Sequence, residues 1–597
     1  MTIYKAPLRD YRFVLAELFD VGELAKLPGY EEATPDLFES VLEEGAKLCE
    51  EVLLPLNRSG DEEGCTFENG VVRTPKGFKE AYDTFRQGGW TALGCDPEYG
   101  GQGLPRTLHT FVEEMICATN LAFGMYPGLS YGAYNALKEH GTDALKARYL
   151  PKLADGTWTG TMCLTEPHCG TDLGQIRTKA EPAGDGGVYK IAGTKIFISA
   201  GEHDLADNIL HLVLAKIPGG PPGTRGISLF LVPKFLSKDD GTLGPRNGMR
   251  CGSIEHKMGI KASSTCVMNF DGAEGYLVGE AHKGMRAMFT MMNGARLGVG
   301  IQGLGLGETA YQTARAYAND RLQGRSVAGT KFPEKPADPI IVHPDVRRML
   351  FTMRAWTEGA RALAAWVAIE LDKAIKHPDP AEREAADDFV SLMTPIVKSM
   401  FTDNGFACAN LGMQVMGGHG YIREWGMEQL VRDCRITQIY EGTNGIQALD
   451  LVGRKLPSHV GRLARRFFHP VDAYIRGRLE KPDLAEFVLP LAKAFGRLQQ
   501  ASALVAQKGL ADPEEAAAAA TDYLRLFGLV ACAYLWTRMA ELAMGKAQGE
   551  GAEAAFYRGK LATARFFMTK LLPESTALFA QIGAGAKPLM ALEAEGV

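Results

Sequence analysis

The carboxylate at position 441 lies in a sequence suited to acid-base chemistry. Apolar and aromatic residues precede it, and a glycine and a helix-capping pair follow it, in the run Gln438-Ile439-Tyr440-Glu441-Gly442-Thr443-Asn444. Apolar neighbours desolvate a carboxylate and raise its proton affinity, and a glycine lets a substrate approach the main chain closely. Glu441 is therefore a candidate base. The run equally fits a structural glutamate before a helix that Thr443 or Asn444 caps.

A second segment with chemical potential lies far upstream. It is the run Met162-Cys163-Leu164-Thr165-Glu166-Pro167-His168-Cys169-Gly170-Thr171-Asp172-Leu173, and Gly193-Thr194-Lys195-Ile196-Phe197-Ile198-Ser199-Ala200-Gly201 follows it. By itself the first run fits a strand that ends in a Pro/Gly turn. Together with Glu441, the two runs resemble the acyl-CoA dehydrogenases, flavoenzymes that desaturate the acyl chain of a CoA thioester between its α and β carbons.

The resemblance runs from about Phe85 to Leu456, with its motifs in the family's order. Several separately placed motifs in one order are much harder to obtain by chance than one glycine-rich match. The opening Tyr4–Phe13 and the long C-terminal segment are similar to a long bacterial branch that acts on fatty acyl-CoA and 3-methylmercaptopropionyl-CoA. The other matching motifs are Pro97–Gly103, His140–Gly156, Lys257–Lys261, Asn293–Arg296 and Gln414–Tyr421.

Desaturation of a thioester needs two events on one substrate. Removal of an α proton needs a positioned base and donors that stabilise negative charge on the carbonyl oxygen. The β hydrogen leaves as hydride, which no side chain accepts, and a flavin would serve as the acceptor. The resemblance implies that Glu441 is the catalytic base and that FAD accepts the hydride. It also implies that the Glu441 amide and a flavin hydroxyl hold the thioester oxygen.

The resemblance further implies which residues bind the cofactor and the substrate. Met162 and Phe197 stand where Tyr and Trp are frequent in the family, which preserves apolar cover but changes stacking on the ring. The implied cofactor-binding residues are Met162, Leu164, Thr165, Gly170, Thr171, Phe197, Ser199, Arg321, Gln414, Gly417, Gly418 and Thr443. The implied substrate-binding residues are Thr171, Asn293, Arg296 and Gly442. The spacing of Asn293 and Arg296 places both on one helix face.

The run Gln414–Gly418 and Arg321 match the stretch with which a neighbouring subunit, in this family, holds the FAD pyrophosphate. Glycines suit this role because main-chain amides reach an anion most easily where no Cβ intervenes. Without the family, the run is a glycine-rich helix end, Arg321 is a solvated helix-end cation, and Arg296 is an ordinary salt-bridged arginine. A structural interpretation is favoured for His168, His343 and His419.

Composition is that of a large enzyme without general affinity for polyanions. The chain has 597 residues and a net charge of -6, which predicts about three or four domains and argues against nucleic acid. Its 11 cysteines lack paired metal spacing, so we expect no metal and a reducing cytoplasm. We expect no secretory signal, and no apolar stretch of the roughly 18 residues that cross a bilayer.

The elements that must position these residues change in type along the chain. Helical periodicity dominates at first, short β-rich runs separated by Gly and Pro follow, and long helical patterns then return. This order predicts an α+β fold of packed domains. As in acyl-CoA dehydrogenases, we expect an N-terminal helical domain at 1–157, a middle β-barrel or sandwich at 158–284, a C-terminal helical bundle at 285–456 and a helical extension at 457–597.

Periodicity and proline set the expected boundaries. Pro395 suits a first helical position, so one helix is predicted to end at Met393 and another to begin at Pro395. The predicted strands are Val188–Ile191, Ile209–Lys216, Ile227–Val232 and Thr265–Phe270. The predicted helices are Leu37–Leu54, Leu108–Ala122, one or two within Ala133–Leu153, Met285–Asp320, Pro344–Ile375, Glu382–Met393, Pro395–Met416, Gly445–Arg454, Pro513–Met544 and Gly551–Leu572.

The implied partners are an acyl-CoA, an electron-transferring flavoprotein and a second copy of the chain in a dimer or tetramer. An acyl-CoA oxidase, which returns electrons to oxygen, remains an alternative, and the acyl group stays open. A membrane- or DNA-binding extension is a further alternative, less favoured than a solvated helix face packed on a neighbouring subunit. The membrane- or DNA-binding alternative is based on a basic cluster near Phe467 and Phe468 that comprises Arg462, Arg465, Arg466, Arg476 and Arg478.

Overall fold

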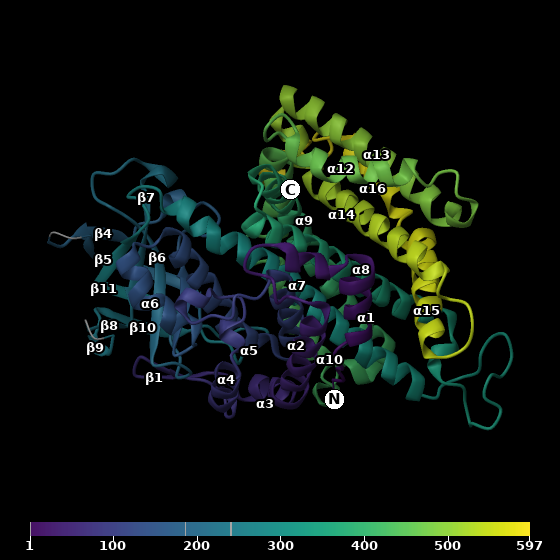
Figure 1. The fold of residues 1–597 in the computed structure, drawn as a ribbon, viewed down its shortest axis with the longest axis horizontal. Helices are drawn as coiled ribbons and strands as arrows, with labels where there is room; N and C mark the ends of the chain where they lie inside the picture. Colours follow the sequence, from purple (N-terminus) through teal and green to yellow (C-terminus); the bar gives the residue numbers. More distant parts are fainter. Residues whose placement is uncertain (1, 185–186, 239–240, 597) are drawn as a thin grey trace. The chain divides into compact units, whose positions relative to one another are not determined.

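The computed structural model describes residues 2–184, 187–238 and 241–596. It forms two compact units assembled from segments that are not consecutive in sequence (Figure 1). The helical unit comprises 1–44, 105–118 and 299–597, and the barrel unit comprises 45–104 and 119–298. Helices precede a middle β region and follow it to the C-terminus, which confirms the α+β prediction. The boundaries at 157, 284 and 456 stay a prediction.

The barrel unit is built on a seven-stranded sheet. Strands β11, β5, β4, β6 and β7 pair in a closed ring, and β10 and β3 extend it beside β11 and β6. The pairs are mostly antiparallel, whereas β3 lies parallel to β6. The middle domain is thus the expected β-barrel. The strands are β3 (Trp158–Cys163), β4 (Lys179–Pro182), β5 (Val188–Ser199), β6 (Asn208–Lys216), β7 (Ile227–Pro233), β10 (Met249–Ile254) and β11 (Thr265–Val278).

Strand β5 continues well beyond the predicted end at Ile191. The prediction stopped there because a glycine in the middle of the strand interrupts the sequence pattern. A Cβ at Gly193 would lie 2.5 Å from the Thr178 hydroxyl, and its φ of 154° is rare for other residues. The glycine therefore marks a close approach within the sheet rather than a strand end. The extra length brings Phe197 and Ser199 to the end of the strand.

Strand β6 is buried on both faces, which explains its continuous apolar sequence. Its residues alternate between two cores. Leu210, Leu212 and Leu214 pack with residues of α5 (Arg106–His140) and α6 (Asp143–Ala154). Val213 and Ala215 pack inside the barrel.

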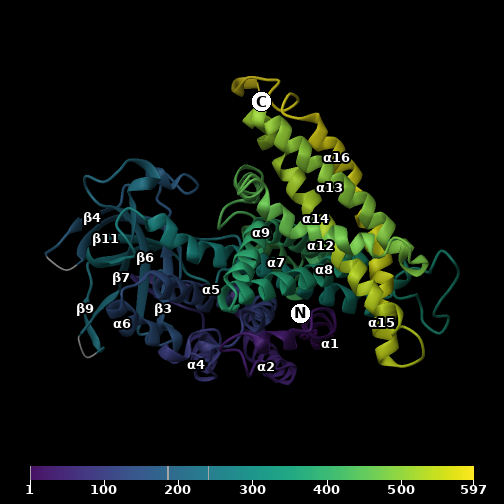
Figure 2. The same ribbon diagram turned by 45° about the horizontal axis from the view of Figure 1, so that its top comes forward.

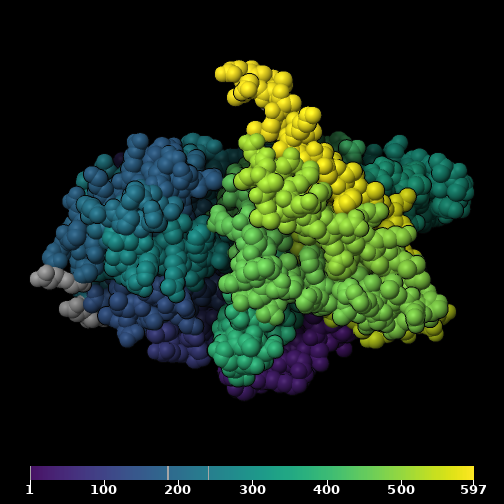
Figure 3. All heavy atoms as spheres, turned by 90° about the horizontal axis from the view of Figure 1, so that it is seen from above, coloured from purple at the N-terminus to yellow at the C-terminus, as the bar shows by residue number. Residues whose placement is uncertain are grey.

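Helices α8 (Pro344–Lys376) and α9 (Pro380–Met416) pack together in the helical unit, and α14 (Pro513–Met544) contacts both. Figure 2 shows α13, α14 and α16 of the extension side by side. The last residues of the chain project from these helices (Figure 3). The remaining helices are α1 (Leu8–Arg12), α2 (Pro35–Lys47), α3 (Leu54–Glu63), α4 (Phe78–Gln87), α7 (Gly284–Asp320), α10 (Met427–Arg435), α11 (Asn444–Asp450), α12 (Arg462–Arg476), α13 (Ala485–Ala511), α15 (Ala552–Phe566) and α16 (Glu574–Ala584).

The predicted helix boundaries at Leu54, Ala122 and Pro395 were wrong, because each lies inside a longer helical run. Helix α9 runs through Pro395, where a new helix was predicted to begin. Proline inside a helix costs about 3 kcal/mol, and the burial of Pro395 and most of its neighbours against α8 and α14 offsets that cost. Helix α5 continues past Ala122 to His140 after a break at Asn120, whose φ of -157° and ψ of 85° are not helical.

Helix α14 corrects the expectation that no segment is long and apolar enough to cross a bilayer. It contains an 18-residue window of mean hydropathy 1.3, and 67% of that window is buried. Trp536, for example, is fully buried and donates its indole N–H to the Ala355 carbonyl of α8 at 3.1 Å. Packing in the helical unit accounts for this composition, since a core helix is apolar for the same reason.

Candidate active site

The candidate residues of the barrel unit gather where β3 and β5 end. Met162 is half-buried at the end of β3, Leu164 is buried, and Thr165 is half-buried in the loop that follows. The Ile196 amide of β5 donates to the Thr165 carbonyl at 2.9 Å. This bond holds the Thr165 loop against β5, so both predicted segments contribute to one surface.

A buried ion pair beneath this surface was missed from the sequence, where its signal was a lysine within an apolar strand. Lys195 Nζ lies 2.8 Å from Glu166 Oε1 and 2.9 Å from the Leu164 carbonyl oxygen. The Glu166 carboxylate also accepts from the Thr178 hydroxyl at 2.6 Å and from the Arg177 amide at 2.7 Å. Burial alone raises the pKa of Glu166, but the Lys195 ammonium and these donors lower it below its ordinary value. The pair thereby fixes the loop that carries Leu164.

The end of β5 presents an apolar ring outward. Phe197 has left-handed backbone with a φ of 59° and is 59% exposed, although a large apolar residue is normally buried and rarely has positive φ. Ser199 is half-buried and pairs with Thr265 of β11. A ring held outward by unusual backbone is placed to cover a ligand.

Gly170 and Thr171 lie exposed beyond a tight turn in which Glu166 and Cys169 exchange backbone hydrogen bonds of 2.9 and 3.1 Å. The structure also brings side-chain atoms of Glu166, His168 and Cys169 within 4.8 Å of one another. This group is a poor metal site, because the carboxylate is already saturated by donors and burial raises the pKa of the Cys169 thiol.

Asn293 and Arg296 share one face of α7, as their spacing predicted. Arg296 Nη1 lies 3.5 Å from Asn293 Oδ1, and the guanidinium lies 6.0 Å from the centre of the Phe289 ring. Arg296 is buried, whereas Asn293 is exposed. The pair therefore offers one shielded cation and one accessible amide to a polar ligand.

Glu441 lies in a turn of the helical unit with its backbone in the left-handed region. Its φ is 59°, and the side chain is half-buried. Gln447 Nε2 donates to the Glu441 and Gly442 carbonyls at 3.2 and 3.4 Å. The Tyr440 hydroxyl donates to the Gln302 side chain. Burial, with the nearby Cys117 and Glu441, raises the pKa of Tyr440 well above its ordinary value, so this donor keeps its proton.

Thr443 caps helix α11, which begins immediately after the turn. Its hydroxyl accepts from the Ile446 amide at 3.3 Å, and the residue is exposed. The capped helix of the structural interpretation is therefore present, and it supports the turn that carries Glu441. The two interpretations of this run are compatible.

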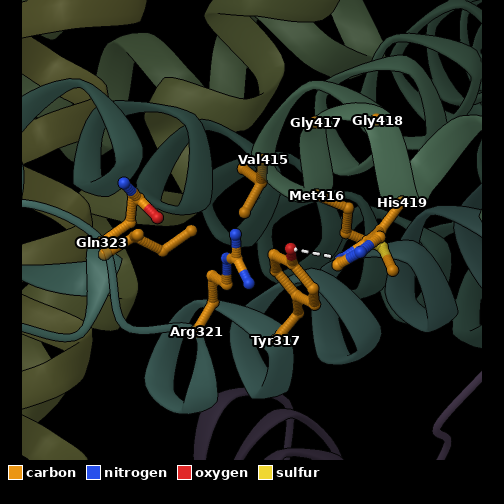
Figure 4. A pocket seen from close by; sticks show the side chains of 9 residues that line it. Tyr317, Arg321, Gln323, Val415, Met416, Gly417, Gly418 and His419 are labelled. Atoms are coloured by element: carbon orange, nitrogen blue, oxygen red, sulfur yellow. Dashed lines mark hydrogen bonds between the residues drawn. The ribbon is translucent and has the colours of Figure 1, made fainter.

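A pocket of 420 Å³ in the helical unit brings together three of the residues implied to hold a pyrophosphate. Arg321, Gly417 and Gly418 line it, with Val415 and Met416 among its apolar neighbours, and Figure 4 shows the Arg321 side chain directed into its centre. Gln414 is exposed and is not among the lining residues.

The electrostatics of this pocket favour an anion. The Arg321 guanidinium makes no hydrogen bond or ion pair within the described parts of the chain, so its charge is not neutralised. A Cβ at Gly417 or Gly418 would meet no atom within 4 Å, so the space above both glycines is open. Gly417 also has a φ of 59°, which favours glycine.

The three histidines occupy structural positions. His419 Nδ1 lies 2.8 Å from the Tyr317 hydroxyl at the pocket wall, and its ring stacks on Trp425 at 4.6 Å. His343 precedes α8 and reaches the Gln323 carbonyl at 3.0 Å. His168 reaches the Gln175 carbonyl at 2.9 Å.

The basic cluster of the extension is engaged within the protein. Phe467 is fully buried. Arg462 and Arg466 both pair with Asp388 of α9, at 2.8 and 3.3 Å. Arg478 pairs with Glu541 at 2.6 Å, Arg476 pairs with Asp472 at 2.7 Å, and Arg465 donates to the Val460 carbonyl at 2.9 Å. These contacts leave the membrane and DNA alternatives without a specific supporting observation.

Comparison with known proteins places the whole chain in one family. Models of the acyl-CoA dehydrogenase N-terminal, middle and C-terminal domains match residues 38–157, 161–273 and 282–456, and an acetyl-CoA dehydrogenase C-terminal-like model matches 467–593. The 3-methylmercaptopropionyl-CoA dehydrogenase of Ruegeria pomeroyi is 44% identical over 97% of this chain and 98% of its own. A butyryl-CoA dehydrogenase of Syntrophomonas wolfei is 34% identical over 96% and 95%.

A solved structure shows the same fold across the extension. The Caenorhabditis elegans protein ACDH-11, in complex with C11-CoA, superposes with a TM-score of 0.78 over 99% of this chain and 95% of its own, at 18% identity. The matches to these sequence relatives extend over nearly the whole of both chains. The family's fold, including the extension, and its activity therefore describe the full chain. The chain belongs to the acyl-CoA dehydrogenase family and is an FAD-dependent oxidoreductase that acts on the CH–CH bond of an acyl-CoA.

Proposed function

We propose that Glu441 is the base that removes the α proton in the oxidation of the acyl-CoA to the trans-2-enoyl-CoA, in which the β hydrogen would leave as hydride to bound FAD. The observation that carries this proposal is the turn itself, in which a half-buried carboxylate has a φ of 59° before Gly442. Such backbone persists only where its surroundings impose it, and it is typical of functional sites. The Glu441 amide is the implied donor to the thioester oxygen, where it would stabilise the developing negative charge.

FAD supplies the hydride acceptor when it is bound. Two features of the barrel unit suit a flavin: Phe197 offers an exposed ring, and Thr165 offers a half-buried hydroxyl in the loop that is hydrogen-bonded to Ile196 of β5. Met162, Leu164 and Ser199 would complete this side, with Gly170 and Thr171 at its rim. Asn293, Arg296 and Thr171 would meet the CoA portion of the substrate. Gly442 of the helical unit remains a proposed substrate contact.

We propose that the 420 Å³ pocket holds part of the FAD of a second copy of the chain, which makes the enzyme a homodimer at least. An unneutralised Arg321 beside two open glycines suits the pyrophosphate. The apolar side of the pocket, with Ile340 and Val415, suits an uncharged portion of the cofactor. Gln414 and Thr443 remain proposed contacts outside the pocket lining.

We propose a short acyl chain as substrate, with 3-methylmercaptopropionyl-CoA first among the candidates. The Ruegeria relative that acts on this thioester is 44% identical, against 34% for the butyryl-CoA relative. Replacing the thioether sulfur by CH₂ gives pentanoyl-CoA, which has nearly the same shape. A steady-state series should therefore give similar kcat/KM for these two thioesters and a value about 10- to 200-fold lower for an acyl chain that is one methylene shorter or longer. A preference for palmitoyl-CoA would contradict this choice.

The test of the base is Glu441→Gln, which keeps the size of the side chain. General base catalysis contributes about 10²- to 10⁴-fold, so we expect a loss of that size in kcat with an unchanged flavin spectrum. Normal turnover by this variant would contradict the proposal.

We propose an electron-transferring flavoprotein as the acceptor of the electrons. Mixing the substrate-reduced enzyme with air distinguishes this from an oxidase. Slow reoxidation is expected, and rapid stoichiometric peroxide would make the oxidase the correct assignment.

A further inference from the structure

One carboxylate oxygen of α9 holds both ends of the turn that carries Glu441. Gln438, before Glu441, donates its side-chain amide to Asp403 Oδ1 at 2.7 Å. Asn444, after Glu441, donates its side-chain amide to the same oxygen at 2.7 Å. The turn from 438 to 444 is therefore closed by a single acceptor on a neighbouring helix.

Each amide is oriented by a cation on its other side. Lys398 Nζ, on a fully buried lysine of α9, donates to Asn444 Oδ1 at 2.8 Å. Arg435 Nη1 of α10 donates to Gln438 Oε1 at 3.1 Å. Because ammonium and guanidinium groups only donate, each amide must turn its oxygen to the cation and its NH₂ to Asp403. Both amides therefore need a hydrogen-bond acceptor at position 403, and the Asp403 carboxylate provides it.

Further contacts of Asn444 fix it more firmly. Its amide also donates to the Thr402 hydroxyl at 3.0 Å and to the Ser399 carbonyl at 3.3 Å. The first residue of α11 is thereby anchored to α9 along one turn of the α9 helix. Between the two anchored amides, the backbone passes through Glu441 with its φ of 59°.

We propose that Asp403 is a positioning residue that sets the place of the Glu441 carboxylate and its shielding from water. The inference rests on the proposed role of Glu441 as the base. Left-handed backbone at a non-glycine residue is strained and persists only where the structure around it imposes it. Asp403 imposes it by holding both ends of the turn, so its loss lets the turn relax and the carboxylate move.

Three variants separate this role from a general effect on folding. Asp403→Ala removes the shared acceptor, and Asp403→Asn retains one oxygen that can still accept. Asp388→Ala is the matched control, because Asp388 lies on the same helix and pairs with Arg462 and Arg466 far along the chain. A displacement of about 1 Å at a reacting group can cost on the order of 100-fold in rate. We therefore expect Asp403→Ala to lower kcat on that order with KM little changed, and Asp403→Asn to recover most of the rate.

Two readouts distinguish positioning from a merely structural role. Water that reaches a loosened turn lowers the proton affinity of Glu441, so the ascending limb of kcat/KM should move to lower pH in Asp403→Ala alone. Hydrogen exchange of the peptide 438–444 should rise in Asp403→Ala and stay unchanged in Asp388→Ala. An unmoved pH limb with unchanged exchange at 438–444 overturns the proposal, and so does an equal loss of kcat in Asp388→Ala.

Glu441→Gln belongs in the same series, because it separates failure of the two proposals. If Glu441→Gln keeps turnover, the base assignment fails, and with it the purpose assigned to Asp403. If Glu441→Gln loses turnover while Asp403→Ala behaves as the unsubstituted enzyme, the base stands and only the positioning role is overturned.

Discussion

Lys195 and Glu166 illustrate how one buried ion pair fixes a loop that carries candidate flavin contacts. Lys195 is fully buried and Glu166 is 3% exposed. The ammonium also holds the Leu164 carbonyl, so it joins the carboxylate to the loop backbone at the end of β3. Removing one partner of such a pair leaves an uncompensated buried charge, which is far more damaging than the loss of an exposed pair.

We predict that Lys195→Met lowers the free energy of unfolding by about 3 to 5 kcal/mol and speeds release of FAD. Denaturant titration and flavin fluorescence measure the two effects. Lys190→Met is the control, since Lys190 lies on the same strand, is half exposed and stands 3.8 Å from Glu274. Exposed pairs contribute up to about 1 kcal/mol, so a loss in Lys190→Met equal to that in Lys195→Met would refute the argument.

Glu114 gives a prediction about pH. Arg361 is surrounded by Glu114, Glu308 and Asp10, at 2.7, 2.9 and 2.5 Å. Burial raises the pKa of Glu114 to about 7, although Arg361 opposes the shift. The folded state thus binds a proton that the unfolded state has already lost, so this group's stabilisation is complete below pH 4.5 and is lost as the pH rises to about 7. Glu114→Gln should flatten the pH dependence of unfolding in that window, and an unchanged profile would contradict the assignment.

Helix α9 shows what the sequence could and could not predict at the scale of elements. Its 3.6-residue periodicity indicated a helix on both sides of Pro395, but the sequence alone did not show that α8 and α14 would bury the proline. In the same way, the predicted strand ended at Ile191, because only the folded sheet shows that Gly193 of β5 lies close against Thr178. Periodicity is local, and these boundaries were decided by partners distant in sequence.

The extension is tied to the dehydrogenase helices through α15. Lys560 of α15 is fully buried and pairs with Glu358 of α8 at 2.8 Å and with Asp10 of α1. One lysine therefore joins three elements that lie far apart in the sequence. Its Nζ also lies 5.7 Å from the centre of the Trp536 ring.

We predict that Lys560→Met destabilises the protein by about 3 to 5 kcal/mol, because two carboxylates lose their shared cation. Arg565→Ala, on the next turn of α15, removes an exposed pair with Glu486 and should cost about 1 kcal/mol or less. The midpoint of thermal unfolding measures the loss of stability. The rate of protease cleavage at Phe556 and later residues measures the detachment of α15. Equal midpoints for the two variants would show that the cluster does not clamp the extension.

At the scale of the whole molecule, the candidate site divides between residues that a motif could reveal and residues that it could not. The family resemblance pointed to Arg321, Gly417 and Gly418, and the structure places all three around one pocket. It gave no sign of Lys195 or Asp403, because their roles arise from contacts made across the fold rather than along the sequence. A lysine within an apolar strand was a local sign of the buried pair of Lys195, whereas Asp403 had no such sign.

The pocket yields a prediction for the assembled enzyme. If it receives the FAD of a second copy, Arg321→Ala should weaken FAD retention by about 10-fold or more while the fold is kept, since a charge-assisted contact contributes roughly 1.5 to 3 kcal/mol. Arg325→Ala is a nearby control whose guanidinium bonds the Phe332 and Lys335 carbonyls instead. Equilibrium dialysis measures the affinity for FAD, and sedimentation velocity measures the fraction of dimer. Full FAD retention in Arg321→Ala would remove the pocket from the cofactor site.

The most direct measurement follows the α proton by itself. 3,3-Dimethylbutanoyl-CoA has α protons but no β hydrogen, so it can undergo proton abstraction without desaturation. In deuterium oxide, the unsubstituted enzyme should replace its α protons with deuterium, and Glu441→Gln should exchange them no faster than solvent does. Equal exchange by Glu441→Gln and the unsubstituted enzyme would contradict the assignment of Glu441 as the base.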